Sequence, residues 1–343
     1  MYQIKKTDLP KLYAAIAAEN DLFLPVKVAG QTNFGLWTEQ AEADIDTLKT
    51  VKSAKDIFFP QSEVLYQVRR EEGKLAIRGE QTRNAPFVVF GIRGCDVRAL
   101  AVLDKVFLSE PVDSYYAARR QMGTIVSLAC GKPAASCFCK VFGVDCAEPE
   151  GDVVTWLVGD TLYWDAKTEK GIALTEKLTA LLKAADDAAV LAQKAAIRAI
   201  TEKLPYANLS LEKWGAEAAS KNFDSPVWEE LYKPCLACGT CTFVCPTCQC
   251  YDIKDYSTGN GVQRYRCWDS CMYSDFTLMA HGTNRPTQLE RYRQRFMHKL
   301  VYFPSRNEGM YSCVGCGRCI EKCPMNLNIV KVIKALGEGE AND

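Results

Sequence analysis

Several features that whole classes of protein require are scarce in this chain of 343 residues. It has only two histidines, His281 and His298, so a catalytic cysteine would find few histidine partners. Lys plus Arg and Asp plus Glu number 42 each, and this formal net charge of +0 excludes a generally basic nucleic-acid binder and an acidic disordered chain. No apolar run approaches the length of a membrane span. Hydrophobic residues make up 48%, which is ordinary for a globular protein of two domains.

The N-terminus resembles a signal peptide only superficially. Lysines precede an apolar stretch at residues 12–18, but Asp8 and Pro10 interrupt the approach and polar residues follow at 19–21. We interpret Asp8 as a helix cap and the stretch as a short amphipathic helix. Without export the chain is cytoplasmic and meets no oxidising compartment in which disulfides persist.

Cysteine is abundant but unevenly distributed. The chain has 17 cysteines, with none before Cys95 and none between Cys146 and Cys235. An odd number of clustered cysteines in a cytoplasmic chain indicates metal binding rather than disulfide bonds.

The first half of the chain predicts an α/β fold. Residues 87–92 and 124–129 are apolar runs typical of buried strands. Between them, apolar side chains recur at helical spacing from residue 97 to 107, and Asp96 is placed to cap that helix. Strand, helix and strand in this order indicate a parallel βαβ unit. Further strands are expected at 153–158 and 161–164, and helices that cover the sheet within 172–204.

The second half contains one cysteine motif twice. Three cysteines follow one another at gaps of two residues, and a fourth comes after three more residues and precedes a proline. The copies are Cys235, Cys238, Cys241, Cys245 with Pro246, and Cys313, Cys316, Cys319, Cys323 with Pro324. This is the bacterial ferredoxin pattern for 4Fe-4S clusters.

In proteins with two such clusters, the fourth cysteine of each motif ligates the cluster of the other motif. We therefore assign Cys235, Cys238, Cys241 and Cys323 to one 4Fe-4S cluster, and Cys313, Cys316, Cys319 and Cys245 to the second. Structural zinc is the alternative, but zinc sites more often use C-x2-C pairs separated by a longer stretch. An absorption spectrum distinguishes a zinc-stapled scaffold from an iron–sulfur protein.

The stretch between the motifs, 246–312, is long and must contain secondary structure; a helix is expected at 287–300. We expect an α/β domain over 1–204, a linker over 205–226, and a mainly helical ferredoxin domain with two clusters over 227–343. Segments 61–68 and 74–77 are compatible with either strand or helix. Four further cysteines, which form an extra metal site or are buried apolar thiols, are Cys248, Cys250, Cys267 and Cys271.

The N-terminal half offers a possible third cluster. Cys95 and Cys130 each follow a predicted strand, and Cys137 and Cys139 lie one loop further on. Adjacent parallel strands bring such ends to one edge of the sheet, where the N-terminus of the helix at 97–107 favours an anion. We assign these four cysteines to this cluster, with buried structural thiols or a catalytic cysteine as alternatives. Cys146 lies in a polar loop and is expected to be a bystander.

A basic stretch accompanies the second half of the chain. It is either a solvated helix face, or it compensates the charge of anionic clusters or docks an acidic partner. Its members are Arg264, Arg266, Arg285, Arg291, Arg293, Arg295 and Lys299.

Taken together, these motifs resemble a family of iron–sulfur subunits that includes one component of anaerobic sulfite reductase and the sulfhydrogenase beta subunit. The resemblance covers about residues 50 to 335. It rests on segments 90–99, 128–130, 136–139, 235–253, 268–271, 293–299 and 313–320. In that family, cysteines at the positions of Cys248, Cys250 and Cys271 belong to the pattern, whereas one at Cys267 does not.

The resemblance implies an electron-transfer subunit of a multi-subunit oxidoreductase. Its implied partners are a subunit that binds FAD and NAD(P)H, and a terminal subunit of the hydrogenase, sulfite reductase or heterodisulfide-reductase type. The chain itself lacks the G-x-G-x-x-G fingerprint of a dinucleotide site. The alternative is a self-contained iron–sulfur reductase that binds its substrate at a cluster in the N-terminal domain.

Overall fold

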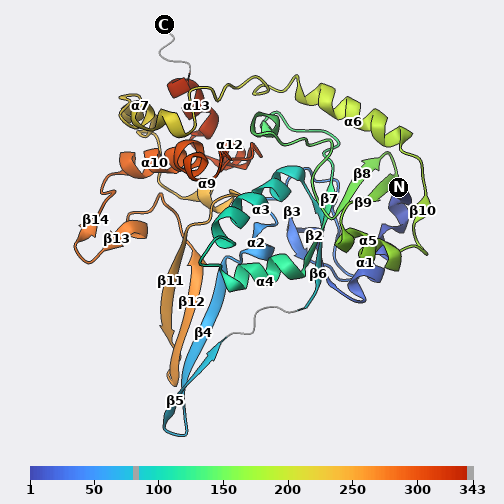
Figure 1. Cartoon of the computed structure of the whole chain (residues 1–343), viewed down its shortest axis with the longest axis horizontal. Helices are drawn as coiled ribbons and strands as arrows, with labels where there is room; N and C mark the ends of the chain where they lie inside the picture. Colours follow the sequence, from blue (N-terminus) through green and yellow to red (C-terminus); the bar gives the residue numbers. More distant parts are fainter. Residues whose placement is uncertain (80–84, 338–343) are drawn as a thin grey trace.

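The computed structural model describes residues 1–79 and 85–337. An eight-stranded sheet forms the centre of the N-terminal part, in the order β10-β1-β9-β8-β7-β6-β2-β3 (Figure 1). Strands β8, β7, β6 and β2 run parallel, as the βαβ unit predicts. The strands are β1 (Tyr2–Lys5), β2 (Asp21–Val28), β3 (Gln31–Leu36), β6 (Phe87–Ile92), β7 (Gly123–Leu128), β8 (Val153–Val158), β9 (Thr161–Ala166) and β10 (Lys183–Ala184).

Strand β6 illustrates why the parallel strands are apolar throughout. Val88 and Phe90 belong to the core that includes side chains of α1 and α5. Phe87 and Val89 belong to the core formed with α2, α3 and α4. Both faces of the strand are covered, so a polar side chain on β6 would be buried away from water. This explains why the strand is apolar throughout. The helices of this part are α1 (Leu9–Ala17), α2 (Lys55–Phe58), α3 (Gly94–Phe107), α4 (Ser114–Met122), α5 (Glu169–Lys177) and α6 (Ala188–Thr201).

The two aspartates expected to cap helices differ in the structure. Asp8 is the N-cap residue of α1, but its carboxylate accepts from Lys11 Nζ at 2.8 Å rather than from a backbone N–H. The prediction for Asp96 is wrong, because α3 already begins at Gly94 and Asp96 lies within its first turn. Its carboxylate instead forms a buried ion pair with Arg318.

A second, antiparallel sheet joins the two halves of the chain, in the order β11-β12-β4-β5. It projects from the body of the molecule (Figure 1). Strands β4 (Ser62–Glu71) and β5 (Lys74–Gly79) come from the segments that the sequence left undecided. Their partners are β11 (Tyr251–Ser257) and β12 (Gly261–Trp268), from the stretch between the two cysteine motifs. The description of residues 227–343 as mainly helical is therefore not confirmed, and strands on both sides of 205–226 share one sheet.

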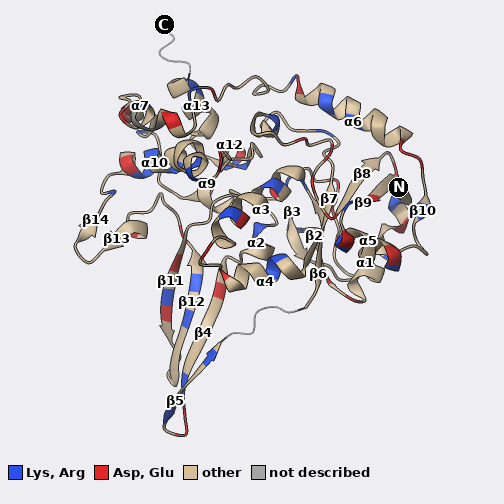
Figure 2. Ribbon diagram, viewed as in Figure 1, with Lys and Arg blue, Asp and Glu red and all other residues tan. Residues whose placement is uncertain are grey.

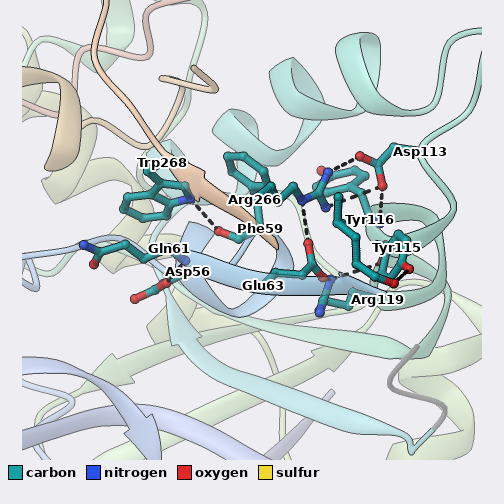
Figure 3. Close-up of polar contacts among 11 residues, drawn as sticks. Asp56, Phe59, Gln61, Glu63, Asp113, Tyr115, Tyr116, Arg119, Arg266 and Trp268 are labelled. Atoms are coloured by element: carbon teal, nitrogen blue, oxygen red, sulfur yellow. Dashed lines mark hydrogen bonds and ion pairs between the residues drawn. The ribbon is translucent and has the colours of Figure 1, made fainter. Parts of the chain in front are cut away.

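A buried ionic network anchors this sheet to α4 (Figure 3). Arg266 on β12 donates to the Glu63 carboxylate at 2.5 Å and also pairs with Asp113. Asp113 caps α4 by accepting from the Tyr116 N–H at 2.9 Å, and Arg119 of α4 pairs with Glu63. Arg264 on the same strand instead makes an exposed ion pair with Asp255 on β11. Basic residues of β12 thus lie beside acidic residues of β11 (Figure 2).

The helix expected at 287–300 is confirmed. Helix α10 (Gln288–Met297) starts with a capping box between Thr287 and Glu290 and continues into the π-helical turn His298–Tyr302. Around it lie α7 (Ala219–Phe223), α8 (Trp228–Leu231), α9 (Thr240–Phe243), α11 (Phe303–Arg306), α12 (Arg318–Lys322) and α13 (Ile329–Gly337). The remaining short elements are η1 (Lys6–Asp8), η2 (Cys139–Phe142), η3 (Ala216–Ala218), η4 (Asp275–Thr277), β13 (Leu278–Met279) and β14 (Gly282–Thr283).

A separate apolar core lies beneath these helices. It contains Trp228, Phe296 and Leu300, and it extends to Phe138 of the N-terminal half. Trp214, from the stretch expected as a linker, is buried in the same core. Within residues 1–79 and 85–337, no helix is both long and apolar enough to cross a membrane.

Candidate metal centres

The two cysteine motifs fold alike. In each, three cysteines line a tight loop that ends in a short helix, α9 or α12. Gly239 and Gly317 precede these helices with left-handed φ values of 71° and 77°. At Gly315, φ is 60°, and an added Cβ would lie 2.4 Å from the Phe138 carbonyl oxygen. The second motif is therefore packed directly against the loop that carries Cys137 and Cys139.

The first cavity is a small space around the cysteines of the first motif. Three cysteines of the first motif line it, together with the fourth cysteine of the second motif. This set is Cys235, Cys238, Cys241 and Cys323. Cys238 is exposed, and hydrogen bonding with Thr240 lowers the pKa of its thiol. The exposed apolar side chains of Leu236 and Met325 border the same cavity, so this site opens toward the surface.

The second cavity lies deeper, among buried side chains that include Phe138 and Lys299. Its cysteines show the reciprocal pattern, with three from the second motif and the last of the first. This set is Cys245, Cys313, Cys316 and Cys319. Burial raises the pKa of Cys316 to about 12, and in the first cavity that of Cys241 to about 11. Such thiols ionise at neutral pH only when a cation or a metal replaces the proton.

Buried cations supply part of the positive charge that thiolates in the two cavities need. Arg295 lines both cavities, and Lys299 lines the second. Lys299 Nζ donates to Thr247 Oγ1 at 2.8 Å and to the Ser312 carbonyl at 2.9 Å. Burial opposes the charge of Lys299, but Cys245 and Cys248 outweigh it and raise its pKa. Arg295 Nε is buried without a hydrogen-bond partner among the described residues. Cations placed in this way fit an anionic cluster in each cavity.

The rest of the basic stretch has other roles. Arg266 belongs to the network at α4, and Arg264 pairs with Asp255 at the surface. Arg293 lies over the Phe223 ring at 3.7 Å, and Arg291 donates to the carbonyls of Arg285 and Pro286. Neither interpretation of the stretch holds for all of it: Arg295 and Lys299 line the cysteine cavities, whereas Arg266 lies in a buried ionic network away from them.

The N-terminal cysteines also converge. Cys95 lies at the start of α3 and Cys130 follows β7, while Cys137, Cys139 and Cys146 come from the next loop. All five are buried. Cys146 is buried, and its thiol lies beside those of Cys130 and Cys139. The sequence did not indicate this burial, because Cys146 follows Asp145. That Cys146 ligates no iron stays a prediction.

Two buried arginines, Arg93 and Arg318, lie beside this group of cysteines. Arg93 donates to the carbonyls of Ala129 at 2.8 Å and Ile45 at 2.8 Å. The neighbouring Cys146 thiol lowers the pKa of Cys130 most, and the nearby charge of Arg93 lowers it further. Arg318 and Asp96 form a bidentate pair at 2.5 and 2.7 Å. This pair lies between Cys95 of the N-terminal group and Cys316 of the second cavity, so the two sites are neighbours.

The four extra cysteines do not form one group. The Cys250 and Cys271 thiols lie beside each other, and the Cys248 thiol lies beside that of Cys245. Cys267 lies on β12 beside Lys254 and Asp252, apart from the other three. Lys55 of α2 reaches this region and donates to the Cys248 carbonyl at 2.9 Å. Sequence reasoning missed Lys55 because 193 residues separate it from Cys248 and no local pattern marks it.

Comparisons with known proteins agree with this geometry. Residues 234–327 match the family described as a 4Fe-4S dicluster domain. This matched segment contains all eight motif cysteines. The chain is 31% identical over 345 residues to "Sulfhydrogenase 2 subunit beta" of Pyrococcus furiosus, with 96% of each chain covered. The chain belongs to the sulfhydrogenase beta subunit family. No solved structure matches it.

Family membership confirms the resemblance seen in the motifs. The chain is an iron–sulfur electron-transfer subunit with a 4Fe-4S dicluster domain, part of the oxidoreductase machinery. The relative is named as a subunit of a sulfhydrogenase, so the relative is part of a complex.

Proposed function

We propose that this chain relays electrons in the cytoplasm between a subunit that binds FAD and NAD(P)H and a terminal redox subunit. The terminal subunit is of the hydrogenase, sulfite reductase or heterodisulfide-reductase type, and the chain has no substrate site of its own. One observation supports this best: two cavities, each lined by four motif cysteines in the crossed arrangement, share the buried Arg295.

The proposed ligand sets follow the cavity linings. Cys235, Cys238, Cys241 and Cys323 hold the first cluster, and Cys245, Cys313, Cys316 and Cys319 hold the second. Each 4Fe-4S cluster, when bound, supplies one-electron transfer whose potential depends on hydrogen bonds, burial and nearby charge.

The protein's own side chains set the direction of access. Cys238 is exposed and bordered by Leu236 and Met325, so a redox partner can approach the first cavity closely. The second cavity is enclosed by Phe138, Arg295 and Lys299. We propose that one partner docks over Cys238, and that Arg295 and Lys299 stabilise negative charge further inside.

We propose a third 4Fe-4S cluster on Cys95, Cys130, Cys137 and Cys139. Buried Arg93 and the N-terminus of α3 favour an anion there. Because Cys95 and Cys316 are neighbours, this cluster would extend the relay inward from the second one.

The experiment purifies the chain anaerobically, alone and with its partner subunits. About eight irons per chain are expected if the dicluster domain alone is loaded, and about twelve with the N-terminal cluster. Iron well below eight, with zinc in its place, contradicts the proposal. The chain alone should exchange electrons with reduced dye but turn over no sulfite or sulfur substrate. Substrate turnover by the isolated chain would instead establish the self-contained reductase.

A further inference from the structure

A buried ion pair connects the N-terminal cysteines to the second motif. The side chains of Asp96 on α3 and Arg318 on α12 are each 2% exposed. The guanidinium donates to the two carboxylate oxygens of Asp96 at 2.5 and 2.7 Å, and its Nε donates to the Thr50 carbonyl at 3.0 Å. Three separate segments of the chain therefore hold both charges in fixed positions.

Each charge of this pair lies beside a different group of cysteines. Asp96 directly follows Cys95, and its Oδ1 lies 4.0 Å from the Cys95 Sγ atom. Arg318 belongs to the second motif and directly precedes Cys319, which lines the second cavity. Cys95 and Cys316 are members of one buried core. The pair thus acts on both groups through the protein interior, where little water screens a charge.

The pair is a dipole whose negative end faces the N-terminal cysteines and whose positive end faces the second motif. The thiols agree with this orientation. Burial raises the pKa of both Cys95 and Cys316. For Cys95, the charge of Asp96 has more effect on the pKa than that of Arg318. For Cys316 this order is reversed.

Cohesion between the two halves of the chain does not by itself explain an ion pair at this place. The desolvation of two buried charges offsets much of their attraction, and well-packed apolar residues often stabilise a protein as well. The halves also pack closely where Gly315 meets the backbone of Phe138. Arg295 and Lys299 already bring positive charge to the second cavity. Arg318 adds a cation together with a carboxylate that moderates it.

We propose that the Asp96–Arg318 pair is a fixed dipole that tunes the second 4Fe-4S cluster, with Arg318 raising its reduction potential and Asp96 limiting the rise. The inference rests on the proposed function, because it takes the four cysteines of the second cavity as ligands. A cluster gains negative charge on reduction, so a nearby positive charge stabilises its reduced form. At the proposed N-terminal cluster the same dipole lowers the potential, which favours electron transfer from there to the second cluster.

The test measures the reduction potential of the second cluster in the full chain by EPR-monitored titration. The signal that Cys313→Ser alters identifies this cluster. Asp96→Asn keeps the size of the side chain but removes the negative charge, so the potential should rise. Arg318→Gln removes the positive charge, so the potential should fall. Each change should be about tenfold in the equilibrium constant for reduction, which is about 59 mV.

The opposite signs distinguish a dipole from a purely structural role. A site that is merely loosened admits water in both variants and shifts the potential in one direction. In the double variant, Asp96→Asn with Arg318→Gln, the potential should lie between those of the two single variants. The cluster of the first motif should keep its potential in all of them.

Asp104→Asn is the matched control. Asp104 lies on the same helix α3 and also binds an arginine in bidentate fashion, with Arg120 donating to its two carboxylate oxygens at 2.8 Å. It lies about 12 Å further along the helix axis than Asp96. Asp104→Asn should therefore leave the potential of the second cluster unchanged.

Failure of this inference differs from failure of the proposed function. A second-cluster potential that does not rise in Asp96→Asn overturns the inference, even where Arg318→Gln fails to fold. Shifts in the same direction in both single variants, or an equal rise in Asp104→Asn, overturn it as well. If the wild-type chain shows no second cluster at all, the proposed function itself is wrong.

Discussion

Cys245 and Cys323 are each the last cysteine of their motif, and each lines the cavity of the other motif. Cys245→Ser should therefore perturb the cluster held mainly by Cys313, Cys316 and Cys319. EPR and Mössbauer spectra of the variant identify the altered cluster. The reciprocal variant Cys323→Ser should alter the other cluster. A change confined to the cluster of the variant's own motif contradicts the crossed assignment.

The N-terminal thiols allow a comparison between two neighbouring cysteines. Cys137→Ser should remove about four irons while both motif clusters persist, because Cys137 is one of the proposed ligands. Cys146→Ser should keep its iron, although its thiol contacts those of Cys130 and Cys139. Iron and sulfide counts decide the matter. If only Cys146→Ser loses iron, the fourth ligand is Cys146; if neither does, these thiols are core residues.

His298 makes the stability of the protein depend on pH. Burial, with help from the charge of Lys299, lowers its pKa to about 4. The unfolded chain therefore binds a proton near pH 6.5 that the folded chain does not bind until about pH 4. Stability should fall as the pH drops from 6.5 to 4, by roughly 3 kcal/mol, and level off below.

Denaturant unfolding between pH 5 and 7.5 measures this slope. His298→Asn should flatten it, and His281→Asn is the matched control because His281 is exposed. An equal slope in the wild-type chain and in His298→Asn contradicts the assignment.

At this scale, the sequence predicted the side chains whose spacing is local. The eight motif cysteines follow from gaps of two and three residues. The sequence did not mark three buried cations as important, because their hydrogen-bond partners lie 36 to 268 residues away along the chain. These are Lys55, Arg93 and Arg318. Nothing near Asp96 distinguishes a helix cap from the partner of a distant arginine. The burial of Cys146 likewise depends on residues distant in the sequence, such as Ala99 of α3 and Ile197 of α6, which belong to the same core.

At the scale of elements, Arg266 connects β12, β4 and α4 (Figure 3). In Arg266→Ala, Glu63 keeps only Arg119 as an ion-pair partner, and Asp113 loses its arginine partner. Both carboxylates then lie in a buried setting with less compensating charge. The unfolding free energy should fall by about 3–5 kcal/mol. Arg264→Ala, two residues earlier on the same strand, breaks an exposed pair and should change the unfolding free energy far less. Thermal and denaturant unfolding of both variants test the difference, and equal losses contradict it.

The elements themselves were predictable where both faces are buried or where a cap marks the start. Residues 87–92 are apolar without interruption, and Thr287 with Glu290 begins α10. Strand β11 is exposed along almost its whole length, so it carries no alternating pattern. Strands β4 and β5 could not be told from helices, because the partner that stabilises β4 lies in the other half of the sequence.

At the scale of the whole molecule, the two halves are interlocked. The second sheet takes strands from both, and Gly315 packs against Phe138. A fragment of residues 227–343 would lose β4 and the loop around Phe138, and with them the support of the second cavity. Expressed anaerobically, it should hold clearly fewer than eight irons, whereas the full chain holds at least about eight. A fragment with two intact clusters contradicts this prediction and supports an independent ferredoxin domain.

The pairing of β4 with β12 also has a consequence during synthesis. The hairpin of β4 and β5 leaves the ribosome about 190 residues before β12. At roughly 5–20 residues per second, one edge of β4 stays bare for about 10–40 seconds. Exposed edges recruit other strands, so nascent chains are most vulnerable to aggregation in this interval. Chaperones that shield the hairpin should then raise the yield of the chain.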